Sequence, residues 1–170
     1  GPWTLVLQSV SNTFSGPLVV DSPDGALVAE NGANFGYSGS LDGTGSITVL
    51  SGTVSTPHGF FLGNQGINNR VGLLTGSGSS WTGGGSYFRM AFRSSGNVFT
   101  VDSNAQLITS ATYVNMGGNS GSFTSQSNSL IVTNGGRFVI AGAATPAIGS
   151  FSSNNTLVVT GTNSQFTMAG

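Results

Sequence analysis

The sequence predicts an all-β domain folded as a parallel β-solenoid, and three observations point to this fold class. Short runs of alternating apolar residues, bounded by glycine, asparagine and serine, recur along the chain, as in Leu5–Leu7, Ile47–Val49 and Leu130–Val132. No stretch of ten or more residues shows helical periodicity free of glycine. Three markers return in the same order about once every 30 residues, which is the signature of a repeat architecture.

The first marker is an asparagine followed two and four residues later by large apolar residues. It occurs four times, at Asn69, Asn97, Asn128 and Asn155, with spacings of 28, 31 and 27 residues. We expect these asparagines to align at one corner of the coil, where each amide can bond to the amides above and below it. The alternative is that they are ordinary turn residues, since asparagine tolerates left-handed backbone. The residue four positions after each asparagine is predicted to point inward, which gives a first internal stack of Leu73, Val101, Val132 and Val159.

A second marker follows each of these strands after a polar turn. It is a large apolar residue, predicted to form a second inward stack of Trp81, Leu107, Phe138 and Phe166. The third marker, an aliphatic residue followed by glycine or alanine, occurs at Leu62-Gly63, Met90-Ala91, Met116-Gly117 and Ile148-Gly149. Each repeat therefore holds about three short strands, and equivalent strands of successive turns are expected to pair in parallel at ~4.8 Å spacing.

The first part of the chain follows the same pattern less regularly. Gly45 and Gly16 each precede apolar residues at the second and fourth positions, and Trp3–Leu7 reads as one more strand. We predict one domain over residues 1–170, with irregular turns at 1–44 and regular turns at 45–170. The expected coil has about six turns of 24–31 residues and no helical caps.

Composition limits the function classes. The 170 residues include 28 glycines and no cysteine, and the formal net charge is −1. This charge lacks the basic footprint of a nucleic-acid-binding protein. No segment approaches the ~20 apolar residues of a membrane helix, so we expect no membrane insertion. The absence of cysteine fits an extracellular or cell-surface protein without disulfides.

The opening residues carry a resemblance to a known family. Trp3-Thr4-Leu5-Val6-Leu7, Asn12-Thr13-Phe14-Ser15-Gly16 and Leu18-Val19-Val20 together resemble the autotransporter-associated β-strand repeat. Later segments look like repeats common in large bacterial surface proteins: Leu74–Trp81, Val132–Phe138 and Val159–Phe166. The resemblance implies a right-handed parallel β-helix in an exported passenger region of a Gram-negative-type bacterium.

The sequence offers little catalytic chemistry. Sugar-cleaving β-helices need two or three acids within ~5 to 9.5 Å, and the acids here are Asp21, Asp24, Glu30, Asp42 and Asp102. Only Asp102 has repeat-defined geometry, and no second acid lies at the matching position one turn away. His58 is the single histidine, so the nitrogen and sulfur ligands of a zinc site are lacking, and so are the GGxGxD repeats of calcium-binding rolls. We expect no catalytic residues, no metal and no cofactor.

One strand carries a candidate binding patch. In residues 86–93, Phe88, Met90 and Phe92 alternate with Tyr87, Arg89, Ala91 and Arg93, and one set is expected to face inward and the other outward. Tyr87, Arg89 and Arg93 are therefore a candidate lateral patch for glycans or host surface molecules, with a merely solvated strand face as the alternative.

Three functions remain open from the sequence. A solenoid has two open ends that need covering, so the first expectation is a structural rod segment of an exported bacterial surface or filament protein. Such a segment would stack end to end with further repeats or identical copies. The second is an adhesin module that binds through the Tyr87, Arg89 and Arg93 patch. The third is a polysaccharide-active enzyme using Asp102.

Overall fold

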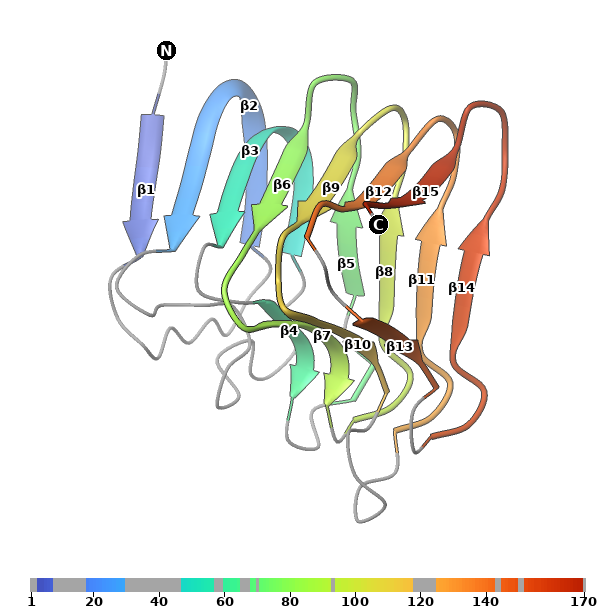
Figure 1. Cartoon of the computed structure of the whole chain (residues 1–170). Helices are drawn as coiled ribbons and strands as arrows, with labels where there is room; N and C mark the ends of the chain where they lie inside the picture. The colour runs from blue at the N-terminus through green and yellow to red at the C-terminus, as the bar shows by residue number, and fades with distance from the viewer. Residues whose placement is uncertain are drawn as a thin grey trace.

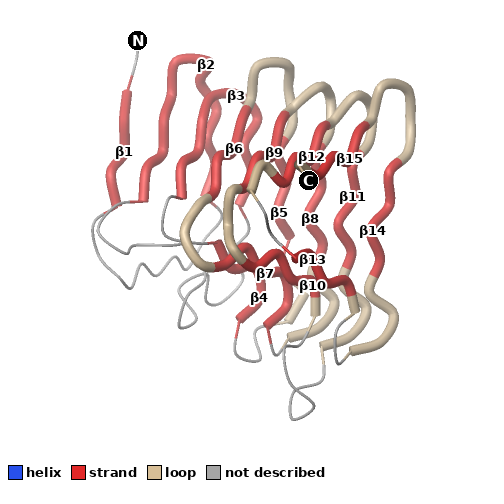
Figure 2. Tube along the Cα trace, in the orientation of Figure 1, coloured by secondary structure: helices blue, strands red, loops and turns tan. Residues whose placement is uncertain are grey.

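The computed structural model is an all-β, parallel β-solenoid of about four turns (Figure 1). It describes residues 3–7, 18–29, 47–56, 60–64, 68–69, 71–92, 94–117, 125–142, 145–149 and 152–169. Every regular element in these ranges is a β-strand, and the described connections between strands are turns and loops (Figure 2). None of the described segments forms a helix of the length and hydrophobicity that a membrane crossing requires.

The coil has three faces, which we number in chain order. Face 1 consists of β5 (Val71–Leu74), β8 (Val98–Val101), β11 (Ser129–Val132) and β14 (Thr156–Val159). Face 2 consists of β6 (Ser80–Gly83), β9 (Gln106–Thr109), β12 (Arg137–Ile140) and β15 (Gln165–Met168). Face 3 consists of β4 (Phe60–Asn64), β7 (Tyr87–Phe92), β10 (Tyr113–Met116) and β13 (Thr145–Ile148).

The first two faces merge at the N-terminal end. The long strand β3 (Ile47–Thr56) pairs through its first half with β5 and through its second half with β6. Strand β2 (Leu18–Ala29) runs alongside β3 across both halves, with register irregularities around Asp21–Ala26 where the sheet bends. Strand β1 (Trp3–Leu7) pairs only with the second half of β2. Faces 1 and 2 are therefore one 11-stranded sheet, and face 3 is a separate four-stranded sheet.

The number of turns is smaller than the expected six. Strands of all three faces occur together in four turns, β3–β4, β5–β7, β8–β10 and β11–β13. The last turn contributes β14 and β15 on faces 1 and 2, and β1 and β2 precede the first turn with strands on all three faces. The larger number expected from the sequence includes these additional turns, whose described strands lie in the sheet of faces 1 and 2.

All described strand pairs are parallel, and apart from β2 with β3 they keep a regular register from turn to turn. Val101 pairs with Val132, which pairs with Val159. Trp81, Leu107, Phe138 and Phe166 also occupy one column, which continues through Val54 and Leu27 to Leu5. The third marker forms a column on face 3, through Leu62, Met90, Met116 and Ile148.

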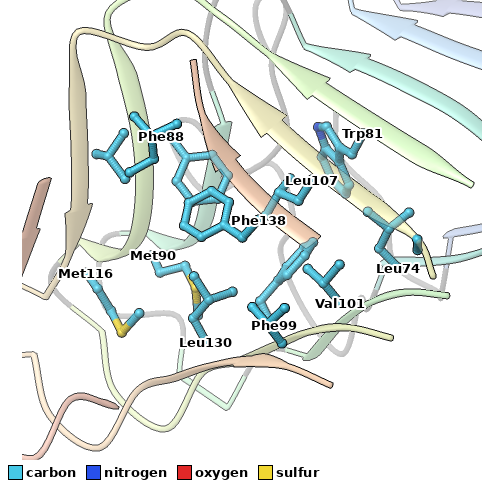
Figure 3. Close-up of a cluster of buried hydrophobic side chains, with 14 of the residues drawn as sticks. Leu74, Trp81, Phe88, Met90, Phe99, Val101, Leu107, Met116, Leu130 and Phe138 are labelled. Carbon is cyan, nitrogen blue, oxygen red and sulfur yellow. The ribbon is translucent and has the colours of Figure 1, made fainter. Parts of the chain in front are cut away.

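The core is the interior of the coil, where these columns meet (Figure 3). Val101, Leu107 and Val132 are fully buried, and Trp81 packs edge-on against Phe99 with ring centroids 5.7 Å apart. Because every turn repeats the inward positions of the previous one, each apolar side chain lies against its equivalents above and below. Hydrophobic burial therefore acts along the axis of the coil.

The predicted register of the turn containing Asn69 is wrong by one residue. Leu74, not Leu73, pairs with Val101, and Leu74 is fully buried while Leu73 is half-buried on the outward side. The neighbouring pair is Gly72 with Phe99. A shift of one residue moves a whole strand's side chains to the other side of the sheet, so Asn69 is also displaced from the position of Asn97.

Candidate functional site: the corners, the outer side of face 3 and the open end

A column of asparagine amides runs along the corner that precedes face 1. Asn97 Nδ2 donates to Asn128 Oδ1 at 2.9 Å, and Asn128 Nδ2 donates to Asn155 Oδ1 at 2.7 Å. The same oxygens also accept the backbone N–H groups of Asn97 and Asn128, at 2.9 and 3.2 Å. The column ends on Asn155 Nδ2, which donates to Ser152 Oγ at 2.7 Å. Each buried amide is thus bonded to the turn above or below it.

Asn69 has a different role. It has a φ of 57°, as do Ser127 and Asn154 at the equivalent positions of later turns, and Gly96 at that position has a φ of 72°. Asn69 N–H donates to Ser95 O at 2.9 Å, and Gly96 N–H donates to Gln126 O at 3.0 Å. Asn69 therefore provides the left-handed residue just before the corner, a conformation that asparagine adopts more readily than most residues.

Asp102 belongs to the corner between faces 1 and 2. Its backbone N–H donates to Leu74 O, as the N–H groups of Thr133 and Thr160 donate to Val101 O and Val132 O. Its carboxylate accepts hydrogen bonds from Asn134 Nδ2 at 2.8 Å, Ser103 Oγ at 3.0 Å and Thr75 Oγ1 at 3.4 Å. These contacts hold three adjacent turns together at the corner.

Glu30, Asp42 and His58 lie outside the described residues. Within the described ranges, no three His, Cys, Asp or Glu side chains gather in a way that could hold a metal ion. The Asp102 carboxylate thus faces hydroxyl and amide donors of its own coil.

The outer side of face 3 carries two tyrosines and an arginine. Tyr87 stacks on Tyr113 of the next turn, with ring centroids 5.5 Å apart and planes 22° from parallel. The guanidinium carbon of Arg89 lies 3.8 Å from the centroid of the Tyr87 ring. Burial lowers the pKa of the Arg89 guanidinium from its ordinary value, and the interaction with Tyr87 partly offsets this effect. Arg89 is therefore packed along the strand surface as well as charged.

The predicted patch needs two changes. Arg93 lies outside the described residues, and Ala91, expected to face outward with it, is fully buried. Ala91 has a φ of 65°, which ends the strand alternation after Met90 and turns the chain inward. The prediction from sequence also missed Tyr113, which is half exposed. Its spacing of 26 residues from Tyr87 was the available signal, because that spacing lies within the repeat period.

The last turn leaves the interior of the coil open. Ile148, Val159 and Met168 have exposed fractions of 49%, 44% and 50%. Their equivalents one turn earlier, Met116, Val132 and Ile140, have 4%, 0% and 0%. The same kinds of side chain are thus buried inside the coil and uncovered at its end.

A small apolar cavity lies in this open region. Its volume is about 20 Å³, and its lining includes Phe138, Ile148, Leu157 and Phe166. At the opposite end, Trp3 and Leu5 of β1 are 39% and 43% exposed. Both ends of the described coil therefore present uncharged, apolar strand residues.

Comparisons with known proteins give no further assignment. No family model matches the chain, no curated protein matches it, and no solved structure matches it. Asn12–Gly16, the central part of the resemblance to the autotransporter-associated repeat, lies outside the described residues.

Proposed function

We propose that this chain is a structural rod segment of an exported bacterial surface or filament protein, and that its function is to stack end to end with further repeats or identical copies. The observation that carries the proposal is the contrast at the last turn. Val159 and Met168 are about half exposed, while Val132 and Ile140, which hold the same positions one turn earlier, are fully buried. A further turn placed on β14 and β15 would bury both columns.

The strength of such stacking follows from comparing the free energy of apolar burial with the cost of association. Complete burial of an aliphatic side chain contributes about 1.5–3 kcal/mol, so covering the exposed halves of three columns contributes a few kcal/mol. Association of two molecules costs roughly 4–15 kcal/mol in lost freedom of motion. Hydrogen bonds between the strand edges have to supply the remainder, and stacking of isolated copies should therefore require high protein concentration.

The proposal is tested by a charge placed at the end of the coil. In Met168→Asp, an end residue that is 50% exposed becomes charged, and stacking would bury that charge. Val71→Asp is the matched control, because Val71 is 51% exposed but lies on the outer side of face 1. Sedimentation velocity over a concentration series should show large assemblies for the unmodified chain and Val71→Asp, and monomers for Met168→Asp. Equal assembly of both variants, or no assembly of the unmodified chain at any concentration, would contradict the proposal.

A second candidate function is glycan binding on face 3. It is favoured by the half-exposed Tyr113, which stacks on Tyr87, and by Arg89, which lies over the Tyr87 ring. Aromatic and arginine side chains recur at binding sites. A glycan array should then give a signal that Tyr113→Ala removes and Val71→Asp retains. An array without signal excludes this function for the chain.

The third expectation, a polysaccharide-active enzyme, has the weakest support. Asp102 has donors on both carboxylate oxygens, from Thr75, Ser103 and Asn134, and these contacts explain its position as a corner residue. Any polysaccharide-cleaving activity should be unchanged in Asp102→Asn, and its loss in that variant would revive the enzymatic function.

A further inference from the structure

The two ends of the 11-stranded sheet carry complementary strands on the same face. Strand β1 lies at the N-terminal end of the sheet beyond β2, and β15 lies at its far end beyond β12 (Figure 1). Both belong to face 2, because β1 pairs with the half of β2 that continues through β3 into β6. Neither Trp3–Leu7 nor Gln165–Met168 contains a charged residue.

The strand register defines which residues of these two strands are equivalent. One column of paired residues connects them, and it consists of Leu5, Leu27, Val54, Trp81, Leu107, Phe138 and Phe166. The neighbouring column connects Thr4 with Gln165 in the same way, through Ala26, Thr53, Ser80, Gln106 and Arg137. Leu5 and Phe166 thus hold the same position in the repeat.

The backbone groups that point away from the sheet at its two edges are also complementary. Gln165 N–H donates to Gly136 O and Ala169 N–H donates to Ile140 O, both toward β12. Successive residues of a strand point their backbone groups to opposite sides, so Phe166 and Met168 direct theirs to the outer edge. Thr4 holds the position of Gln165, and its N–H therefore points away from β2, toward the place of a preceding turn.

We propose that β1 of a second copy pairs in parallel with β15, with Thr4 opposite Gln165 and Leu5 over Phe166. This proposal rests on the proposed end-to-end stacking and specifies its partner and register. The contact continues the hydrogen-bonding pattern of face 2 across two molecules. Docking through β14 and β2 would be hindered, because β1 extends one strand beyond β2 and would meet β15 first. The resulting contact is head to tail and repeats without closing, which produces a fibre.

Engineered cysteines test the register, since the chain has none of its own. Thr4→Cys and Gln165→Cys are made in separate preparations, and both positions are exposed. Paired residues of adjacent strands lie ~4.8 Å apart, within the Cα range of disulfides. The matched control is Thr4→Cys mixed with Thr167→Cys, which is equally exposed but two residues further along β15. That offset gives a separation of about 8 Å, beyond the ~7 Å limit for disulfides.

The mixtures are oxidised under assembling conditions and separated on a non-reducing gel. We expect several-fold more covalent dimer from the Thr4→Cys and Gln165→Cys mixture than from the control mixture, and loss of that dimer on reduction. Equal yields from the two mixtures, or dimers from Thr4→Cys alone, would overturn the proposed pairing.

Sedimentation of the same samples separates the two proposals. Assembly without the Thr4–Gln165 disulfide refutes the β1–β15 contact and leaves end-to-end stacking standing. No assembly, even of the unmodified chain, refutes both.

Discussion

At the scale of single residues, asparagine serves two purposes in this coil. Asn97 and Asn128 are completely buried, and their amides bond from turn to turn. Asn69 and Asn154 are exposed and provide left-handed backbone one position earlier. The two roles differ because the side chains point to different sides of the corner. An inward amide needs hydrogen-bond partners, since an unpaired buried polar group costs about 1–3 kcal/mol. The outward asparagine needs only its permissive backbone.

The buried amide column can be tested at its centre. Asn128→Ala removes the acceptor of two Asn97 donors and the amide that donates to Asn155. We expect it to lower the free energy of unfolding by about 2–4 kcal/mol, measured by urea denaturation. Asn155→Ala, at the partly buried last rung, should cost less than half as much. Equal losses in both variants would show that the column does not depend on burial.

At the scale of elements, adjacent strands fit through complementary volumes. Gly72 of β5 pairs with Phe99 of β8, and a Cβ atom at Gly72 would lie 2.4 Å from Phe99 Cδ2. The ring of Phe99 thus occupies the space that a side chain at position 72 would fill, and it reaches Trp81 beyond. Close packing of this kind fixes the alignment of the two strands, because interiors tolerate little change in volume.

The fit between β5 and β8 makes Gly72→Ala destabilising. Phe99 is fully buried and cannot move aside, so overpacking should reduce the free energy of unfolding by about 1–3 kcal/mol. Phe99→Leu in the same chain should relieve the contact. In a double-mutant cycle by urea denaturation, the combined loss should therefore be smaller than the sum of the single losses. Additive losses would mean that the two positions do not compete for space.

At the scale of the whole molecule, charged residues are sparse. The chain has four basic and five acidic residues among 170. The described ends of the coil are apolar, with Trp3 and Leu5 at one end and Ile148, Val159 and Met168 at the other. The proposed contacts between such ends would depend on apolar burial and backbone hydrogen bonds, neither of which is screened by salt as ion pairs are.

End-to-end assembly should therefore respond to salts in a distinctive way. Raising sodium chloride from about 0.05 to about 0.5 M should leave the assembled fraction unchanged, because only exposed charges are screened over this range. Ammonium sulfate should increase the assembled fraction, since sulfate strengthens the burial of apolar surface. Light scattering at fixed protein concentration measures both responses. Dissociation by sodium chloride would instead indicate contacts between charged side chains.

The fold class and most of the inward columns could be predicted from the order of the residues alone. The predicted inward residues Val101, Leu107, Val132 and Phe138 are all buried, while Phe166 in the last turn is partly buried and Val159 is 44% exposed. This succeeded because strand alternation and the repeat period together assign each residue to one side of the coil. The handedness of the coil and the family assignment stay predictions that rest on the resemblance alone.

Strand register could not be predicted where an inward position carries no side chain, and it became clear from the packing between turns. Gly72 has no side chain to mark an inward position, so Asn69 and Leu73 fitted the pattern one residue too early, until the packing of Phe99 against Gly72 set the alignment. Alternation likewise placed Ala91 outside, whereas its left-handed backbone turns it into the core. Both errors have one physical cause. The local sequence pattern shows only which side chains are apolar, whereas strand register is fixed by contacts between turns that are far apart in sequence.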